Sequence, residues 1–444
     1  MQKMEIKNNL SKLMKPSTPT PPNLRTYNIS FFDEQMPNIN TPLILYYTSS
    51  QKPQTNEHVD IFNHLETSLT KTLTDFYPLA GRYIRDKSFV DCSDQGALYV
   101  QATTNFRLSD FLNLTRELKY NMLHEFLPCD IGEAGEIDDP LLSIKITAFE
   151  CGGVAIGMCF SHKVCDMATM NTFVINWAIR SQEACNSLEL EKYSPIFNIA
   201  HDFPKRGVLD LSPRIPRSSI GVKSTGRMFS FKANAISKLR ETLVFNDARG
   251  HRPSKVQLIV ALLWKALAHV DKLNNEQPKA SVLQQGVNLR NKVVPKLPHY
   301  SCGNFISGAI ARVEPEHVDT IDLQGFLKIL NESVKKIESD YAKALTSSNK
   351  EYDVLMEPFL EYFRYIANND VNFYAFTSWC KFSFHNADFG WGKSVWRSTG
   401  KYGGQNFVLM MDDQEGDGVE AWVHLDENRM SQFEQDLDIQ AYTN

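Results

Sequence analysis

The feature that most constrains the fold is an alternation of strand-like and helix-like segments that runs through two halves of similar length. Apolar runs typical of buried strands are followed by segments with helical spacing of their apolar residues. The pattern restarts after Ser194 to Arg227, a weakly periodic stretch rich in Pro, Ser, Arg and Lys. Stretches of this kind often join domains. The sequence therefore predicts an α/β protein with mixed sheets, in which a crossover at 201–226 joins an N-terminal domain, 1–200, to a C-terminal domain, 227–444.

Several elements are predicted with clear boundaries. In the first half we expect a strand at 42–47 and a helix at 61–76. We also expect two hairpins, one at 88–101 that turns at Asp94-Gln95-Gly96 and one at 141–160 that turns at Cys151-Gly152-Gly153. In the second half we expect strands at 227–231, 282–290, 304–311, 372–379, 406–411 and 420–423, and helices at 233–244, 256–267, 323–341 and 430–437.

Composition narrows the class of protein. The net charge is −5 and no long basic block is present, which argues against nucleic-acid binding. No apolar run approaches the roughly 18 residues that span a membrane, and the N-terminus has no apolar core of a secretory signal. None of the 8 cysteines forms a Cys-x-x-Cys pair, so we expect reduced thiols. These observations predict a cytoplasmic protein, and we expect a monomer.

The candidate site follows the apolar run 154–160. His162 stands where the predicted strand ends, Asp166 comes four residues later, and the residues after it predict a helix. A His and a carboxylate in this position suit acid–base chemistry. The same pair occurs as satisfied core residues, and as metal ligands it lacks the further ligands that a metal site needs. We therefore expect no metal.

A second unusual stretch is Asp388-Phe389-Gly390-Trp391-Gly392, followed by Lys393-Ser394. Its end is similar to a phosphate-binding P-loop, but Ala387 occupies the place of the first glycine, which excludes that motif. The glycines Gly390 and Gly392 around a Trp indicate a tight turn, and both a structural loop and a ligand contact remain open. A segment near 372–392 could also pack with the N-terminal domain.

Together, His162-x-x-x-Asp166 and Asp388-Phe389-Gly390-Trp391-Gly392, in this order and at this distance, resemble the plant BAHD acyltransferase family. Further blocks that are similar to that family are Lys15 to Pro21, Phe76 to Arg82, Val287 to Arg290, Gly303-Asn304 and Thr377 to Trp379. The blocks are most similar to the branch of alkaloid O-acetyltransferases that includes vinorine synthase. The resemblance covers nearly the whole chain.

The resemblance implies two domains related to chloramphenicol acetyltransferase, with the active site in a through-channel at their interface. It also implies an acyl-CoA as co-substrate, with acetyl-CoA the expected donor, and no bound cofactor. His162 would be the general base, and Asp166 would either orient its ring or serve a structural role. By the same resemblance, the Trp379 indole would face the oxyanion, and Thr377 and Ser378 would line the coenzyme A arm.

Other positions carry more than one interpretation. Ser254 and Lys255 match a region near the coenzyme A phosphates, but they could equally be a helix cap and a solvated lysine. Arg290 is the family-matched partner for a buried Asp166 carboxylate, because its planar fork suits a bidentate pair. Met167 departs from the family, which usually has Gly or Ala after the Asp, and this could reshape the pocket.

The predicted function is acetyl transfer from acetyl-CoA to a hydroxyl of a plant specialised metabolite such as an alkaloid. The same chemistry on an acylsugar, another alcohol or an amine remains open, because acceptor pockets are built from scattered apolar side chains. A catalytically inactive binding module on this fold is a further alternative, since function resides in sites rather than folds.

Overall fold

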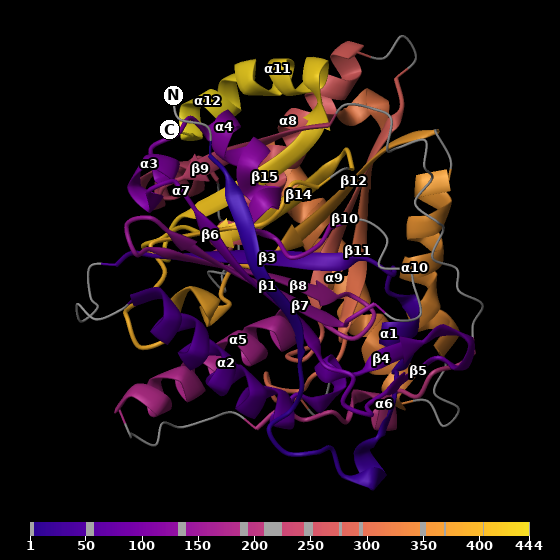
Figure 1. Cartoon of the computed structure of the whole chain (residues 1–444). Coiled ribbons are helices and arrows are strands. Elements are labelled where there is room, and N and C mark those ends of the chain that lie inside the picture. The colour runs from indigo at the N-terminus through magenta and orange to yellow at the C-terminus, as the bar shows by residue number, and fades with distance from the viewer. Residues whose placement is uncertain are drawn as a thin grey trace. The chain divides into compact units, whose positions relative to one another are not determined.

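The computed structural model of the chain (Figure 1) describes most of its residues. The described ranges are 4–49, 57–131, 139–186, 194–207, 224–243, 252–274, 278–292, 296–346, 352–367, 370–402 and 404–443. Residues 208–223, which make up most of the predicted crossover, lie outside the described residues.

The chain divides into two compact units, and each unit is built from three separate stretches of the sequence. Unit 1 comprises Met1–Ser212, Pro298–Phe305 and Phe382–Lys401, and unit 2 comprises Pro213–Leu297, Ile306–Lys381 and Tyr402–Asn444. The sequence placed Asp388 to Gly392 in a C-terminal domain at 227–444, in a segment that could pack with the N-terminal domain. Those residues belong to unit 1, whereas the start of the 372–392 segment stays in unit 2.

The main sheet of unit 1 is mixed. Its described strands are ordered β1-β6-β7-β8-β3-β13. Their bounds are β1 Ile6–Met14, β3 Asn40–Tyr47, β6 Ala97–Thr104, β7 Leu142–Phe149, β8 Val154–Ser161 and β13 Trp396–Ser398. The antiparallel pair β7 and β8 confirms the predicted hairpin, with Leu142 opposite Phe160. Every residue of β8 is buried, as its unbroken apolar run predicts.

The helices of unit 1 include two long ones, α2 Glu57–Asp75 and α5 Met167–Asn186, which pack side by side (Figure 1). Shorter helices are α1 Phe31–Gln35, α3 Leu108–Leu112, α4 Arg116–Met122 and α6 Ile199–Asp202. Both long helices were predicted from the sequence. A reciprocal capping box between Ser30 and Asp33 caps the N-terminus of the short helix α1.

The predicted hairpin at 88–101 is wrong. Its two strands form, but β5 Phe89–Asp91 joins β2 Thr26–Asn28 and β4 Arg82–Ile84 in a small second sheet, while β6 pairs with β1 and β7. The intervening Asp94 has a φ of 59°, and its carboxylate accepts hydrogen bonds from the backbone and hydroxyl of Thr20. The turn is thus bonded to Thr20, in the segment between β1 and β2, and does not close a local hairpin.

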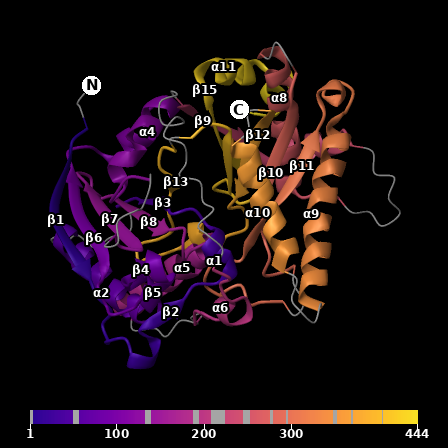
Figure 2. The ribbon, with the colours of Figure 1, turned by 90° about the vertical axis from the view of Figure 1, so that its right-hand side faces the viewer.

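Unit 2 is built on a second mixed sheet, whose described strands are ordered β11-β10-β12-β14-β15-β9. The bounds are β9 Ser224–Phe231, β10 Ala280–Asn288, β11 Ile306–Val313, β12 Val371–Ser378, β14 Phe407–Asp412 and β15 Val419–Asp426. The helices are α7 Ala233–Glu241, α8 Lys255–Asn274, α9 Leu323–Thr346, α10 Tyr352–Ala367, α11 Glu427–Gln435 and α12 Leu437–Tyr442. Helices α9 and α10 pack against β11 (Figure 2).

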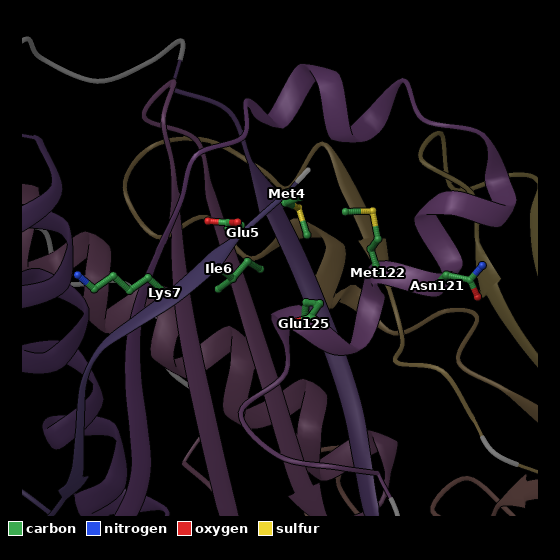
Figure 3. A pocket seen from close by; sticks show the side chains of 7 residues that line it. All are labelled: Met4, Glu5, Ile6, Lys7, Asn121, Met122 and Glu125. Atoms are coloured by element: carbon green, nitrogen blue, oxygen red, sulfur yellow. The ribbon is translucent and has the colours of Figure 1, made fainter. Parts of the chain in front are cut away.

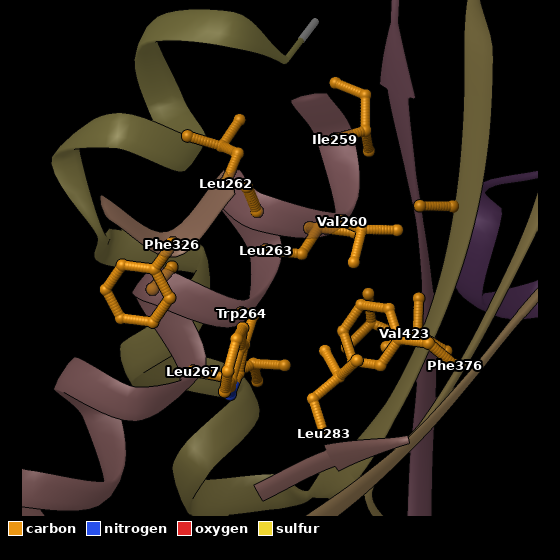
Figure 4. Close-up of a cluster of buried hydrophobic side chains, with 14 of the residues drawn as sticks. Ile259, Val260, Leu262, Leu263, Trp264, Leu267, Leu283, Phe326, Phe376 and Val423 are labelled. Atoms are coloured by element: carbon orange, nitrogen blue, oxygen red, sulfur yellow. The ribbon is translucent and has the colours of Figure 1, made fainter. Parts of the chain in front are cut away.

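The core of unit 2 surrounds α8. Leu262, Leu263 and Trp264 are at most 1% exposed, and Figure 4 shows the helix facing Leu283 and Phe376 of the sheet. The Trp264 indole N–H donates to the Ser281 hydroxyl at 2.9 Å, so the one polar atom of this large side chain is satisfied. A helix that is apolar on most sides must be buried in this way.

Close packing at Gly157 of β8 generates a prediction. A Cβ added there would lie 1.9 Å from the Phe126 carbonyl oxygen. Gly157→Ala should therefore lower the free energy of unfolding by about 1–3 kcal/mol, the usual cost of overpacking. Urea denaturation followed by circular dichroism measures the loss. Gly404→Ala is the control, because an added Cβ there meets nothing within 4 Å. Equal stability of the two variants would contradict the prediction.

Candidate active site

The pairing of β8 with β3 positions His162. The two strands run antiparallel, with Asn40 opposite Ser161. Directly after β8, the His162 backbone N–H donates to the Ile39 carbonyl oxygen at 2.9 Å. The chain then turns through residues 162–164 before α5 begins. His162 is thus held at the end of a fully buried strand, on a turn between a strand and a helix.

Asp166 caps the N-terminus of α5. One carboxylate oxygen accepts hydrogen bonds from the Thr169 backbone N–H at 3.0 Å and its hydroxyl at 3.1 Å. The other oxygen accepts from the Phe305 backbone N–H at 3.1 Å. This is the N-cap geometry that satisfies an otherwise unpaired helical donor. Helix α5 begins at Met167, as the sequence predicts, so His162 lies outside the helix.

The pKa of the His162 ring is shifted toward the neutral form. Burial lowers its pKa below the ordinary 6.5, while hydrogen bonds and the charge of Asp166 raise the pKa and offset part of that effect. The ring atom Nδ1 is buried, although the residue as a whole is only half-buried. A neutral, partly accessible imidazole can accept a proton, as a general base must.

Asn304 is a site residue to which the sequence assigned no role. Its Nδ2 donates to the His162 carbonyl oxygen at 2.8 Å and to the Asp33 carboxylate at 2.8 Å. The Gly303-Asn304 block was visible in the sequence, and so was the Ser30-x-x-Asp33 capping pattern. No local pattern connects them with His162, because the contact spans 142 positions.

Cys165 is fully buried beside the site. Its thiol lies 3.7 Å from the Asp166 carbonyl oxygen. A catalytic thiol has to be accessible to its substrate and activated as a thiolate. The burial of Cys165 therefore favours direct acyl transfer over a route through an acylated cysteine.

The Asp388 loop is held by its own carboxylate. Asp388 Oδ1 accepts from the backbone N–H groups of Gly390 and Gly392, each at 2.8 Å. These glycines have φ values of 105° and 95°, which disfavour any side chain. The loop also bonds to α5, since Gln182 donates to the Asp388 carbonyl oxygen and Ser181 to that of Phe389.

The Phe389 ring extends this anchoring into the core of unit 1. It is fully buried, and its centroid lies 4.9 Å from that of Trp177 on α5, in an edge-to-face arrangement. The P-loop motif was already excluded on sequence. The hydrogen bonds and the packing agree with the structural interpretation of this loop.

The other predicted contacts lie in unit 2. Thr377 and Ser378 end β12, where Ser378 Oγ accepts from the Cys380 N–H at 3.3 Å. Trp379 follows the strand, is 5% exposed, and donates its backbone N–H to the Met410 carbonyl oxygen at 2.7 Å. Their roles toward an acyl donor stay predictions, and so does the predicted channel.

Ser254 is the N-cap of α8. Its hydroxyl accepts from the Gln257 N–H at 3.3 Å, and the Gln257 side chain accepts from the Ser254 N–H at 2.9 Å. This reciprocal pair is a capping box. The helix-cap interpretation of Ser254 therefore accounts for its hydroxyl.

Lys255 is not a solvated lysine. Its ammonium donates to the carbonyl oxygens of Gly416 and Gly418 and lies 2.7 Å from Asp412 Oδ1. An ammonium has three N–H donors, and these three oxygens can engage all of them. A phosphate would have to displace at least one of these contacts, so the geometry favours a structural role.

Arg290 is 1% exposed and lies two residues after β10 rather than at its end. Its guanidinium donates to the Asn288 side-chain oxygen at 3.3 Å. Asp166 belongs to unit 1 and Arg290 to unit 2, and the predicted pair between them stays a prediction.

Three further features bear on the predicted class of protein. Among the described residues, no group of three or more His, Cys, Asp or Glu side chains could hold a metal ion. In the same part of the chain, no helix is both long and apolar enough to cross a membrane. An open pocket of about 690 Å³ between the start of β1 and α4, lined by residues such as Met4 and Met122, contains none of the predicted site residues (Figure 3).

Known proteins resemble the chain over nearly its whole length. A model of the Transferase family matches residues 4–439. Limonoid 21-O-acetyltransferase of Melia azedarach is 33% identical over 99% of this chain and 98% of its own length. Stemmadenine O-acetyltransferase of Catharanthus roseus is 33% identical over 96% and 95%. Vinorine synthase of Rauvolfia serpentina is 34% identical over 96% and 95%, and its crystal structure matches with a TM-score of 0.80 at 29% identity, covering 99% of each chain.

The two mixed sheets and the match to vinorine synthase define an acyltransferase fold related to chloramphenicol acetyltransferase. The chain belongs to the Transferase family of plant BAHD acyltransferases. Its co-substrate is accordingly an acyl-CoA.

The anchoring of the Asp388 loop generates a testable prediction. Asp388→Ala removes the acceptor of two backbone N–H groups, so the melting temperature should fall, by up to roughly 2–4 °C for each kcal/mol lost. Differential scanning fluorimetry measures this change. Asp417→Ala is the control, because Asp417 is exposed in a turn. An unchanged melting curve together with lost turnover would indicate a direct catalytic role instead.

Proposed function

We propose that this enzyme transfers an acetyl group from acetyl-CoA to a hydroxyl group of a plant specialised metabolite such as an alkaloid. The observation that carries the proposal is the neutral, half-buried His162 at the end of β8 in a chain of the acyl-CoA-dependent class. The names of two relatives, which specify O-acetyl transfer to a limonoid and to stemmadenine, support acetyl as the acyl group and a hydroxyl as the acceptor.

The chemistry requires one base and no enzyme-bound intermediate. His162 takes the proton of the acceptor hydroxyl, and the resulting alkoxide oxygen forms a bond to the thioester carbonyl carbon. The tetrahedral intermediate then collapses, the carbon–sulfur bond breaks, and His162 returns the proton to the departing thiolate. Because Nδ1 is buried, Nε2 is the ring nitrogen that we assign to proton transfer. Holding both reactants beside the base contributes by proximity.

The other predicted residues take supporting roles in this proposal. Trp379 donates its indole N–H to the developing oxyanion, and such a preorganised donor stabilises the transition state. Thr377 and Ser378 line the arm of the acyl-CoA. Asp166 has a structural role, since its carboxylate accepts hydrogen bonds from Thr169 and Phe305. For Ser254 and Lys255 we propose a structural role in capping α8 and bonding the β14–β15 turn.

The acceptor and donor are tested together. Purified enzyme is incubated with a panel of acyl-CoAs against alkaloid, limonoid and sugar alcohols and amines, and products are identified by mass spectrometry. Acetylated alcohols support the proposal. Preferred transfer to amines or acylsugars would keep the chemistry and overturn the acceptor. The absence of turnover with all pairs would favour a binding module.

His162→Ala should lower kcat/KM by at least about 10²-fold, the usual contribution of a general base. In the wild type, the neutral base is present above the lowered pKa, so kcat/KM should hold its plateau to below pH 6.5 and fall only as pH drops through that pKa. Steady-state kinetics across pH measures both effects. His201→Ala, at a side chain that is 88% exposed, should change neither. Near wild-type turnover in a folded His162→Ala variant would remove His162 from the mechanism.

Direct transfer also predicts the behaviour of Cys165. Cys165→Ser should retain most activity, and wild-type enzyme incubated with acetyl-CoA alone should show no acetyl adduct by intact-protein mass spectrometry. Cys302→Ser, at another fully buried cysteine, controls for the general cost of this substitution in a core. A stable acetyl group on Cys165 that disappears when acceptor is added would instead establish a two-step route.

A further inference from the structure

Two cysteines of unit 1 lie next to each other beside the strand that leads to His162. Cys159 belongs to β8 and is 1% exposed. Cys129 is half-buried and lies in the segment that follows the short helical turn Leu123–Phe126. The two thiols are hydrogen-bond partners, and Cys159 Sγ lies 3.9 Å from the Cys129 carbonyl oxygen. Both thiols are free in the structure, so the pair has the two neighbouring sulfur atoms that disulfide chemistry needs.

The segment that carries Cys129 packs closely against β8. A Cβ added to Gly157 would lie 1.9 Å from the Phe126 carbonyl oxygen, and Gly157 shares one face of the strand with Cys159, because alternate residues of a strand point the same way. On the other side of Cys129 in the sequence, Ile131 packs against Gly400, where an added Cβ would lie 2.3 Å from Ile131 Cδ1. Close packing before and after Cys129 therefore keeps it beside Cys159.

Two neighbouring strands direct polar side chains toward the Cys129 sulfur. Asn40, the first residue of β3, donates from Nδ2 to Cys129 Sγ at 3.6 Å and to the Asp130 carbonyl oxygen at 3.4 Å. Ser143 of β7 stands opposite Cys159 in the sheet register, and its side chain also forms a hydrogen bond with Cys129. Hydrogen-bond donors stabilise a thiolate more than a thiol, so this environment favours the charged form of Cys129.

The interaction between the thiols has opposite effects on the two cysteines. The hydrogen bond from Cys159 is the largest contribution to the pKa of Cys129 and lowers it. Burial raises that pKa, the Ser143 side chain lowers it, and the charges of Asp130 and Asp139 raise it. The same hydrogen bond, followed by burial, raises the pKa of Cys159. Cys129 is thus the thiol that loses its proton more readily and the one that solvent can reach, and these two properties are typical of a reactive cysteine.

We propose that Cys129 and Cys159 form a redox-active dithiol, which a hydroperoxide oxidises to a disulfide and an external dithiol reduces again. The Cys129 thiolate attacks one oxygen of hydrogen peroxide, the O–O bond breaks, hydroxide leaves, and Cys129 becomes a sulfenic acid. The Cys159 sulfur then attacks the Cys129 sulfur, the S–S bond forms, and the S–O bond breaks with loss of water. In total, two thiols give up two electrons and two protons, and one peroxide becomes two waters.

The disulfide would join β8 to the segment that covers it, close to the candidate base. Asn40, which contacts Cys129, follows Ile39, whose carbonyl oxygen accepts the backbone N–H of His162 at 2.9 Å. Neither Cys129 nor Cys159 takes part in the proposed acyl transfer. The dithiol is therefore a separate modification site, and its oxidation can be measured whether or not the proposed function is correct.

The first test detects the disulfide in native wild-type enzyme. Reduced protein is exposed to graded hydrogen peroxide, the remaining thiols are alkylated in denaturant, and the peptides are identified by mass spectrometry. We expect a linked peptide pair that joins Cys129 to Cys159 and that dithiothreitol separates again. Two outcomes would overturn the proposal. Both thiols could stay reduced at peroxide doses that oxidise free glutathione, or Cys129 could pair with a different cysteine.

The second test separates the roles of the two thiols. Cys159→Ser keeps a hydrogen-bond donor for Cys129 but removes the second sulfur, so Cys129 should accumulate as a sulfenic acid that dimedone traps. Cys129→Ser should leave the buried Cys159 reduced at the same peroxide dose. Because both predictions concern chemical labelling, they need no catalytic turnover.

Cys151 is the matched control, because it is also half-buried and its sulfur accepts a hydrogen bond from the Leu108 backbone N–H at 3.4 Å. Cys151→Ser should leave the link between Cys129 and Cys159 intact. In the Cys159→Ser variant, dimedone labelling should be at least about threefold faster at Cys129 than at Cys151. Each unit by which a thiol pKa is lowered gives roughly tenfold more thiolate and about threefold less nucleophilicity. Equal labelling rates at the two positions would overturn the assignment of Cys129 as the reactive thiol.

Discussion

The hydrogen bonds of the Asp166 carboxylate are the constraint on which the geometry of the site depends. They begin helix α5 through Thr169 and hold the backbone of Phe305, a segment 139 positions away. Thr169 also donates to the Gly303 carbonyl oxygen at 3.1 Å. Asn304, between these two residues, is thereby placed against the turn that carries His162. A carboxylate that accepts several backbone hydrogen bonds is well suited to this role, because its desolvation is offset only when its oxygens are paired.

Helix α5 connects this constraint to the second family motif. Its first turn is capped by Asp166, and its last turns donate from Ser181 and Gln182 to the backbone of the Asp388 loop. The buried Phe389 ring adds an aromatic contact with Trp177 in the middle of the same helix. The two motifs that are most visible in the sequence therefore meet on one helix of unit 1. This arrangement gives a physical reason for both motifs that does not require either aspartate to touch a substrate.

The environment of His162 suits the proposed base, which deprotonates a hydroxyl group for attack on a thioester. A thioester carbonyl is already electrophilic, so the enzyme has to supply a proton acceptor rather than an activated nucleophile of its own. Burial lowers the pKa of His162, which favours the neutral ring, and the Asn304 carboxamide donates to the His162 carbonyl oxygen without adding charge. The buried Cys165 thiol is consistent with a mechanism that uses no enzyme nucleophile.

Local sequence patterns determined much of this protein. The sequence predicted three of these elements: strand β8 from its apolar run, the hairpin of β7 and β8, and the start of α5 after Asp166. Such predictions succeed because hydrophobic periodicity and turn chemistry act over a few residues. The motifs also indicated the family. Contacts between distant segments were decided only by the tertiary structure. The turn at Asp94 bonds to Thr20 and so separates β5 from β6, and Lys255 bonds to the turn after β14. Asn304 reaches His162 across 142 positions. These contacts depend on which hydrogen-bond partner a polar group meets once the chain is folded. The hydrophobic periodicity of a local segment carries no information about that distant partner.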